Sequence, residues 1–278
     1  MTSVDPHGSE ENRVIAENGL ILKVLVGSGV HGTAIEGTDD TDYMGICIEP
    51  PRHVIGVTDP GKRTFQQYQF RSAAERTGDP YARSGSGDVD VVIYSLRKWL
   101  RLALGGNPTV LLPMFTPEEH IAHITEWGRE LRRAVPTFAP SRSAGERFLG
   151  YMRAQREKLL GLRSTQTNRP ELIAQHGFDT KFAMHMIRLG LQGVEYMETG
   201  RITLPIPEPD RSWLVEMRRG GHSRDEALAR ALELESRIQH LLVDSPLPLR
   251  PDWDRANQWL VDTYRAYWEG LSPEGPGE

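Results

Sequence analysis

The sequence has one cysteine, Cys47, and no apolar run near the roughly 20 residues that a membrane-spanning helix needs. A single thiol excludes an internal disulfide framework and fits a reducing compartment. Cys47 stands in the apolar stretch 43–49, so we expect a buried strand thiol and not a nucleophile. The polar, acidic start "MTSVDPHGSEEN" is unlike a signal peptide. These absences predict a cytoplasmic protein without membrane contact.

The chain also lacks an excess of positive charge. Its formal net charge is −5, which argues against a dedicated nucleic-acid binder. The charge is uneven, however, because residues 129–169 hold nine arginines and one lysine against three glutamates, a local balance of +7. On the helix expected after Ser143, the residues Arg153, Arg156 and Arg163 could hold RNA or another polyanionic acceptor. A solvated arginine-rich helix face explains the same pattern equally well. The stretch also lacks a platform of interleaved aromatic residues, on which the bases of a nucleic acid could stack.

Strand patterns dominate the first 116 residues, and helical patterns dominate the rest. Expected strands cover residues 20–26, 43–49, 64–70 and 88–94. Ser95 is expected to cap a helix that ends near residue 104. The polar stretch from Arg71 through "SGSG" at 84–87 predicts a mobile connection. Further helices are expected over residues 118–134, 144–162, 179–199, 224–242 and 253–267, followed by the frayed tail "SPEGPGE". We therefore predict an α+β protein with one domain over residues 1–116 and a helical domain over 117–278.

The stretch "GSGVHG" at residues 27–32 has the literal form G-x-G-x-x-G behind an apolar strand. That form is typical of a dinucleotide-binding turn, which opens a crossover helix in a unit of about 30 residues. The next expected strand already begins near Tyr43. Because about ten residues leave no room for a crossover helix, we expect a turn between two neighbouring strands.

Two carboxylates follow this turn. Asp40 and Asp42 flank Thr41, so at strand spacing both point to one face. Asp90 alternates with Val89 and Val91 on a later strand and supplies a third carboxylate. Carboxylate oxygens suit Mg²⁺ (or Mn²⁺) with substrate phosphates. The alternatives are turn chemistry for the aspartate pair, and solvent-facing positions on an edge strand for Asp88 and Asp90.

The pair Gly27-Ser28, a gap of eleven residues and then Asp40-Thr41-Asp42 resemble the DNA polymerase β-like nucleotidyltransferase superfamily. Within it, the chain is similar to the RlaP/YcgL-type group of predicted nucleotidyltransferases. The stretches "DVDVVIYSLRKWLRLALGGNPTVLLPMF" and "DTKFAMHMIRLGLQGVEYMETGRITLP" extend the resemblance to about residue 220. His31 departs from the group's usual aromatic residue and Thr41 from its usual apolar one, but neither change removes a metal ligand.

The resemblance implies a polymerase β-like palm, with a mixed sheet and flanking helices, followed by a helical domain. It implies a nucleotidyltransferase that moves a nucleoside monophosphate from an NTP, ATP among the candidates, to an acceptor hydroxyl or phosphate with release of pyrophosphate. Asp40 and Asp42 would hold two Mg²⁺ (or Mn²⁺) ions. Asp90 would complete the catalytic ion's ligands and assist deprotonation of the acceptor. Gly27 and Ser28 would bind the phosphates.

A second cluster lies on the helix expected over 179–199. Lys181, His185 and Arg188 recur at i, i+4 and i+7 and therefore share one helix face. Beside the family resemblance, this stripe predicts phosphate binding. The alternative is a solvated lysine and arginine with a hydrogen-bonded histidine.

The acceptor stays open at this point, with RNA or tRNA, a protein and a small molecule as candidates. A toxin-like or resistance enzyme would use the same chemistry on the last two. A catalytically silent nucleotide-binding regulatory module is a further alternative from a different class. The sequence specifies neither the NTP nor the oligomeric state.

Overall fold

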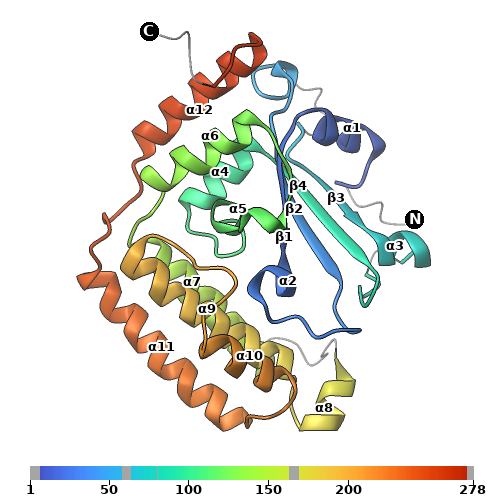
Figure 1. Cartoon of the computed structure of the whole chain (residues 1–278), viewed down its shortest axis with the longest axis vertical. Coiled ribbons are helices and arrows are strands. Elements are labelled where there is room, and N and C mark those ends of the chain that lie inside the picture. The colour runs from blue at the N-terminus through green and yellow to red at the C-terminus, as the bar shows by residue number, and fades with distance from the viewer. Residues whose placement is uncertain (1–6, 58–63, 80, 163–168, 274–278) are drawn as a thin grey trace. The chain divides into compact units, whose positions relative to one another are not determined.

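The computed structural model describes residues 7–57, 64–79, 81–162 and 169–273. Arg163 and most of the predicted frayed tail lie outside these residues. The chain divides into two compact units (Figure 1). Unit 1 comprises Met1–Leu102, Leu112–Phe138 and Asp252–Glu278, and unit 2 comprises Ala103–Leu111 and Ala139–Pro251. The boundary predicted after residue 116 therefore falls inside unit 1, which also takes up the last helix.

The described part of unit 1 is built on a mixed five-stranded sheet in the order β3-β4-β2-β1-β5 (Figure 1). Its strands are β1 (Leu20–Val26), β2 (Thr41–Cys47), β3 (Gln67–Arg71), β4 (Val89–Ser95) and β5 (Ile121–Ile124). β2 and β4 run parallel, and the other neighbouring pairs are antiparallel. The sheet with its flanking helices confirms the predicted α+β class.

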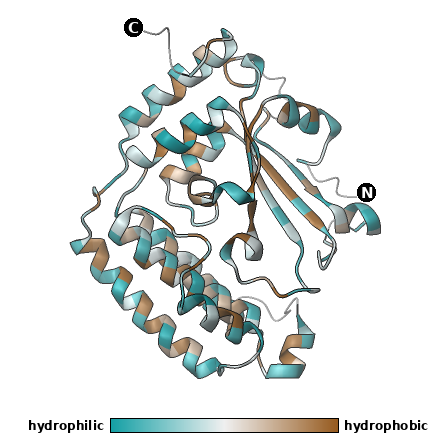
Figure 2. Ribbon diagram, viewed as in Figure 1, coloured by the Kyte–Doolittle hydropathy of each residue, from teal (hydrophilic) through white to brown (hydrophobic). Residues whose placement is uncertain are grey.

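The two faces of this sheet differ in chemistry. α1 (Glu10–Asn18) packs Ile15 and Ala16 against one face, in a cluster that includes Cys47 and Ile93. Side chains alternate along a strand, so Asp90 lies on the opposite face. Hydrophobic residues run through the central strands (Figure 2). As predicted, Cys47 is a buried thiol, and burial raises its pKa well above the ordinary value.

Several helices complete unit 1. They are α2 (Gly27–His31), α3 (Ser72–Thr77), α4 (Leu96–Leu104), α5 (Leu112–Phe115), α6 (Glu126–Ala134) and α12 (Trp253–Trp268), with the short 3₁₀ turns η1 (Pro51–His53), η2 (Glu118–His120) and η3 (Val135–Thr137). α4 continues into unit 2. The N–H of Lys98 donates to Ser95 Oγ at 3.3 Å, which confirms the predicted cap of α4.

Hydrogen bonds to the buried residue Glu49 join the last helix, α12, to the rest of unit 1. The Tyr264 hydroxyl on α12 donates to Glu49 Oε2 at 2.8 Å, just beyond the end of β2. Trp268 Nε1 donates to the backbone carbonyl of Glu49 at 3.1 Å. Glu49 is fully buried, and its burial raises the pKa of the carboxyl group. α12 thus supplies hydrogen-bond donors to the buried Glu49 Oε2 and to the Glu49 backbone carbonyl.

The predicted helix over residues 118–134 is wrong in its first half. Residues Ile121–Ile124 form β5, which pairs antiparallel with β1. The helix begins only after Thr125, whose Oγ1 accepts the N–H of Gly128 at 3.4 Å. The N–H of Thr125 donates to Ile21 O on β1 at 2.9 Å. Pairing with β1 therefore outweighs the local preference for helix in this charged segment.

For residues 71–90, the structure differs from the predicted mobile connection and from the alternative of an edge strand. α3 occupies part of the stretch that was predicted to be a loose connection, and side-chain hydrogen bonds hold the loop that follows it. β4 lies between β3 and β2, so Asp88 and Asp90 do not stand on an edge strand.

Unit 2 is helical in its described residues. Its helices are α7 (Ala144–Leu159), α8 (Pro170–His176), α9 (Thr180–Thr199), α10 (Asp210–Arg218) and α11 (Arg224–Asp244). A Cβ on Gly190 would lie 2.8 Å from Leu234 Cδ1, and one on Gly193 2.8 Å from Ile238 Cδ1, so both glycines allow α11 to pack closely on α9. No helix in the described ranges of either unit has the length and apolar character to cross a membrane.

Candidate active site

Three acidic side chains meet where β1 ends and where β2 and β4 begin. Val26 pairs with Asp42 across β1 and β2, and Asp42 pairs with Asp90 across β2 and β4. Asp40 precedes Asp42 by two residues and so falls on the same side. One carboxylate oxygen from each of Asp40, Asp42 and Asp90 lies within 4.8 Å of the others. The sheet register therefore gathers the three predicted carboxylates into one group.

The stretch "GSGVHG" forms the turn beside this group. Gly27 has a φ of +68°, and a Cβ at this position would lie 2.1 Å from Asp42 Oδ2. Residues Gly27–His31 form the short helix α2, which Gly32 ends with a φ of +70°. β1 and β2 are antiparallel, which confirms that the motif opens no dinucleotide-binding crossover. Gly27 is thus needed both for its backbone conformation and for its close approach to Asp42.

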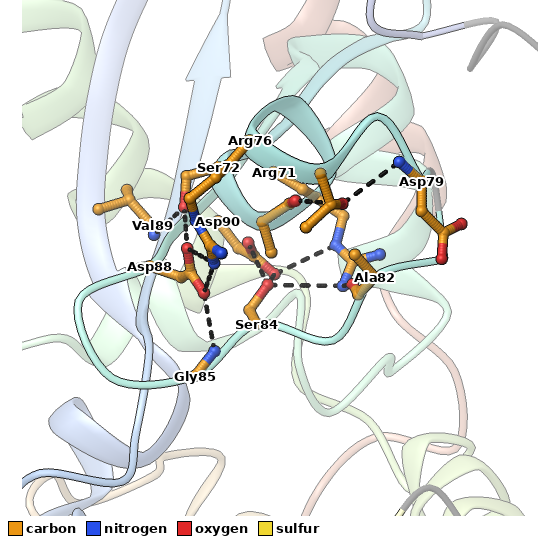
Figure 3. Close-up of polar contacts among 12 residues, drawn as sticks. Arg71, Ser72, Arg76, Asp79, Ala82, Ser84, Gly85, Asp88, Val89 and Asp90 are labelled. Carbon is orange, nitrogen blue, oxygen red and sulfur yellow. Dashed lines mark hydrogen bonds and ion pairs between the residues drawn. The ribbon is translucent and has the colours of Figure 1, made fainter.

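Asp90 is held by two residues that the sequence did not point to (Figure 3). Ser84 Oγ lies 2.8 Å from Asp90 Oδ1 and 3.0 Å from Oδ2. Arg71 Nε donates to Asp90 Oδ2 at 3.3 Å, and Arg71 Nη2 donates to Ala82 O at 2.8 Å. A longer contact of 3.5 Å joins Arg71 Nη2 to Ser84 Oγ. Both partners come from the stretch for which the sequence predicts a mobile connection.

Asp88, two residues earlier, fastens the same loop from its other end (Figure 3). Its carboxylate accepts hydrogen bonds from Arg76 Nη2 at 3.0 Å, from Ser72 Oγ at 2.8 Å and from the N–H of Gly85 at 3.1 Å. Ser72 Oγ also accepts the N–H of Val89 at 2.8 Å. The hydrogen bond from Arg76 is the largest cause that lowers the pKa of Asp88, followed by those from Ser72 and Gly85. Asp88 therefore has a structural role in holding the loop.

The carboxylate group fits a divalent cation by its donor chemistry. Three carboxylates offer the hard oxygen donors that Mg²⁺ and Mn²⁺ take in proteins. Their formal charge is −3, and Arg71 is a cationic side chain in contact with Asp90. Gly27 keeps open the space beside Asp42 that a Cβ would fill. Asp40, Asp42 and Asp90 are therefore the residues that could hold a metal.

In unit 2, the predicted basic stripe lies on α9. The helix begins at Thr180 with Asp179 as its cap, one residue from the predicted start. The Nδ1 atom of His185 is buried without a hydrogen-bond partner. Burial lowers the pKa of His185 well below its ordinary value, and the positive charges of Arg188 and Lys181 lower it further, so the imidazole is neutral at pH 7.

Arg188 on the same face remains a cation despite its surroundings. Burial lowers the pKa of its guanidinium to about 10, and its Nη1 donates to Gln192 Oε1 at 2.8 Å. Arg169 and Arg218 add further positive charge near His185. Several cationic side chains around a neutral imidazole whose Nδ1 has no hydrogen-bond partner have the chemistry of an anion site.

Of the three arginines that were predicted to bind a polyanion, the two that the structure describes differ in their surroundings. Arg153 is exposed on α7. Arg156 Nη1 instead forms an ion pair with the buried carboxylate of Glu235, at 2.7 Å to Oε1. Arg163 lies outside the described residues. Arg156 is thus already paired within unit 2, whereas Arg153 is exposed.

A mixed sheet with three carboxylates gathered at the start of two parallel strands is the arrangement expected of a nucleotidyltransferase palm. Comparison with protein families gives the same class: residues 6–262 match RlaP, described as the RNA repair pathway DNA polymerase beta family. The chain therefore belongs to this family, which is part of the polymerase β-like nucleotidyltransferases.

A crystal structure of a nucleotidyltransferase-like protein from Exiguobacterium sibiricum 255-15 is similar at 11% identity and a TM-score of 0.28, covering 96% of this chain and 94% of that one. None of the curated proteins matches the chain.

Proposed function

We propose that this protein is a metal-dependent nucleotidyltransferase that transfers a nucleoside monophosphate from an NTP to an acceptor, with release of pyrophosphate. The observation that carries the proposal is the gathering of Asp40, Asp42 and Asp90 oxygens within 4.8 Å of one another beside Gly27. Family membership supports the same reaction class. Mg²⁺ or Mn²⁺ held by the three carboxylates would neutralise the charge that develops on the phosphoryl oxygens.

The residues around the group have separate roles in this reaction. Asp90 accepts the proton of the acceptor hydroxyl as the new P–O bond forms and the bond to pyrophosphate breaks. Gly27 and Ser28 bind the phosphates through backbone N–H groups and a hydroxyl, with glycine allowing close approach. The transition state gains charge without new covalent bonds to the protein, so positioning and electrostatics supply most of the catalysis.

We further propose that Lys181, His185 and Arg188 bind phosphate groups of the nucleotide. The cationic surroundings of His185 and its unpartnered Nδ1 support this role. A neutral imidazole can donate one hydrogen bond to a phosphate oxygen, while Arg188 and Lys181 supply charge.

We propose an RNA, tRNA included, as the acceptor. The family description, RNA repair pathway, supports this choice, and the local balance of +7 in residues 129–169 agrees with it. Exposed Arg153 is the better candidate for a backbone contact, because Arg156 is already paired with Glu235. Arg163 stays a candidate from the sequence alone.

The experiment is a transfer assay with each of the four α-labelled NTPs, Mg²⁺ or Mn²⁺, and total RNA. We expect label on RNA from the wild-type protein and a loss of at least about a hundredfold in the Asp40→Asn, Asp42→Asn double variant, because charge neutralisation at the reacting phosphate is lost. The matched control is Asp254→Asn, which removes an exposed carboxylate from α12.

The outcomes separate the alternatives. Label on protein or on a small molecule in place of RNA would keep the reaction and replace the acceptor. NTP binding without transfer to any acceptor would favour a regulatory module. Undiminished transfer by the double variant would contradict the assignment of the two aspartates.

A further inference from the structure

One row of side chains crosses three strands on the face of the sheet that bears the carboxylates. Arg71 pairs with Asp90 across β3 and β4, and Asp90 pairs with Asp42 across β2 and β4. Paired residues point to the same face, so the row consists of the guanidinium of Arg71 followed by the carboxylates of Asp90 and Asp42. Two carboxylates side by side repel each other. Arg71 supplies the positive charge that offsets this repulsion.

The contact from Arg71 is of a kind that a divalent cation can replace. The ion pair joins Nε and Oδ2 at 3.3 Å, and the side chains of Arg71 and Asp90 are 29% and 21% exposed. Ion pairs so close to solvent are weak. A divalent cation facing three carboxylates carries twice the charge of a guanidinium and binds more oxygens.

Arg71 also has partners to keep if the contact with Asp90 breaks. Its Nη2 donates to Ala82 O at 2.8 Å and approaches Ser84 Oγ at 3.5 Å (Figure 3). Asp88 fastens the neighbouring Gly85 through its backbone N–H. The guanidinium would therefore stay with the loop while the Asp90 carboxylate turns toward a metal.

We propose that Arg71 is a positioning residue that takes the place of a cation beside Asp90 and gives way when a divalent metal binds. This inference rests on the proposed function, because it assumes that Asp90 is a metal ligand. Arg71 then offsets the repulsion between the carboxylates in the metal-free site, and it lowers metal affinity because each metal ion must displace it. Ser84, which contacts both oxygens of Asp90, is released in the same step.

The test measures Mn²⁺ binding to the full-length protein without nucleotide, by electron paramagnetic resonance of free Mn²⁺ or by calorimetry. We expect Arg71→Ala to bind Mn²⁺ about three- to tenfold more tightly than wild type, since a competing positive charge is removed. Arg71→Lys keeps the charge and should remain within about twofold of wild type. If Arg71→Ala fails to fold by circular dichroism, Arg71→Gln replaces it, because its amide can still donate to Ala82.

Arg76→Ala is the matched control. Arg76 lies on α3 next to the same loop, but its partner is Asp88 and its side chain is 64% exposed. We expect Mn²⁺ affinity within about twofold of wild type for this variant, because an exposed charge is screened by solvent.

A role in fold alone would make Arg71→Ala bind Mn²⁺ more weakly or unchanged, and either result would overturn the proposal. The effect should also vanish in an Asp90→Asn background. A full gain in affinity there would show a general charge effect and overturn displacement from Asp90.

The two proposals fail separately. Tighter Mn²⁺ binding by Arg71→Ala with no transfer activity in any variant would support the role of Arg71 and reject the enzyme assignment. Absence of Mn²⁺ binding in both wild type and Arg71→Ala would overturn the role of Arg71, while the transfer assay with Mg²⁺ would still judge the reaction.

Discussion

Gly27 combines two demands at one position. Its φ of +68° is rarely adopted by residues with a Cβ, and the missing Cβ leaves room for Asp42 Oδ2. Some other glycines in the described residues meet only the first demand. Gly270, for example, has a φ of +72° with nothing within 4 Å of an added Cβ.

We predict that Gly27→Ala reduces nucleotidyl transfer by at least about tenfold, because the methyl group displaces the Asp42 carboxylate. The strained backbone adds a cost of about 1–2 kcal/mol in unfolding free energy. Transfer assays and urea unfolding measure the two effects. Gly270→Ala is the control, for which we expect the same loss of unfolding free energy but wild-type transfer. Equal transfer by the two variants would contradict the displacement of Asp42 as the cause of lost activity.

At the level of single residues, the sequence predicts the carboxylates but not their partners. Asp40, Asp42 and Asp90 can be predicted because alternation in short strands shows which side chains share a face. Arg71 and Ser84 cannot, because their contact with Asp90 depends on the register of β3 against β4, and register is set by tertiary packing.

At the scale of elements, long periodic helices are the most predictable part. The boundaries of α9 agree with prediction within one residue, since Asp179 and Gly200 supply both end signals. β5 was missed because its four residues pair with β1, about a hundred positions earlier in the chain. Local preference carries no information on such a partner.

α9 also allows a prediction on pH. The pKa of His185 is well below its ordinary value, mainly through burial, so the folded chain stays unprotonated where the unfolded imidazole takes up a proton below about pH 6.5. Its contribution to stability is thus intact above pH 6.5 and is lost as the pH falls.

We predict that wild type loses about 1 kcal/mol more unfolding free energy than His185→Gln between pH 7.5 and pH 5.5. Urea unfolding at both pH values measures the difference. His240→Gln, at an exposed position on α11, serves as the control and should follow wild type. Equal losses in wild type and His185→Gln would contradict the account.

At the scale of the whole molecule, the chain returns to its first unit at the end. Glu49 and Tyr264 are 215 positions apart and share a buried hydrogen bond. The pKa of Glu49 is raised by burial, so the folded chain keeps a proton that the unfolded chain releases above about pH 4.5. This contribution to stability is full at low pH and is lost as the pH rises.

We predict that Glu49→Gln melts about 2 °C or more above wild type at pH 8 and that the gap closes toward pH 5. The amide oxygen can still accept the Tyr264 hydroxyl, so the bond to α12 is kept. Thermal melting followed by circular dichroism measures the shift. Glu119→Gln, an exposed change in the same unit, should leave the melting temperature unchanged at both pH values; a constant gap for Glu49→Gln would contradict the assigned titration.

The position of α12 in the chain has a consequence for synthesis. A ribosome releases the chain from its N-terminus, so every residue of unit 2 has emerged once Pro251 has left the exit tunnel. At that moment, the sheet still lacks α12, and the Glu49 carboxyl group lacks the hydrogen bond from the Tyr264 hydroxyl. The unit that begins first along the chain is therefore the one that is completed last, when α12 has been made.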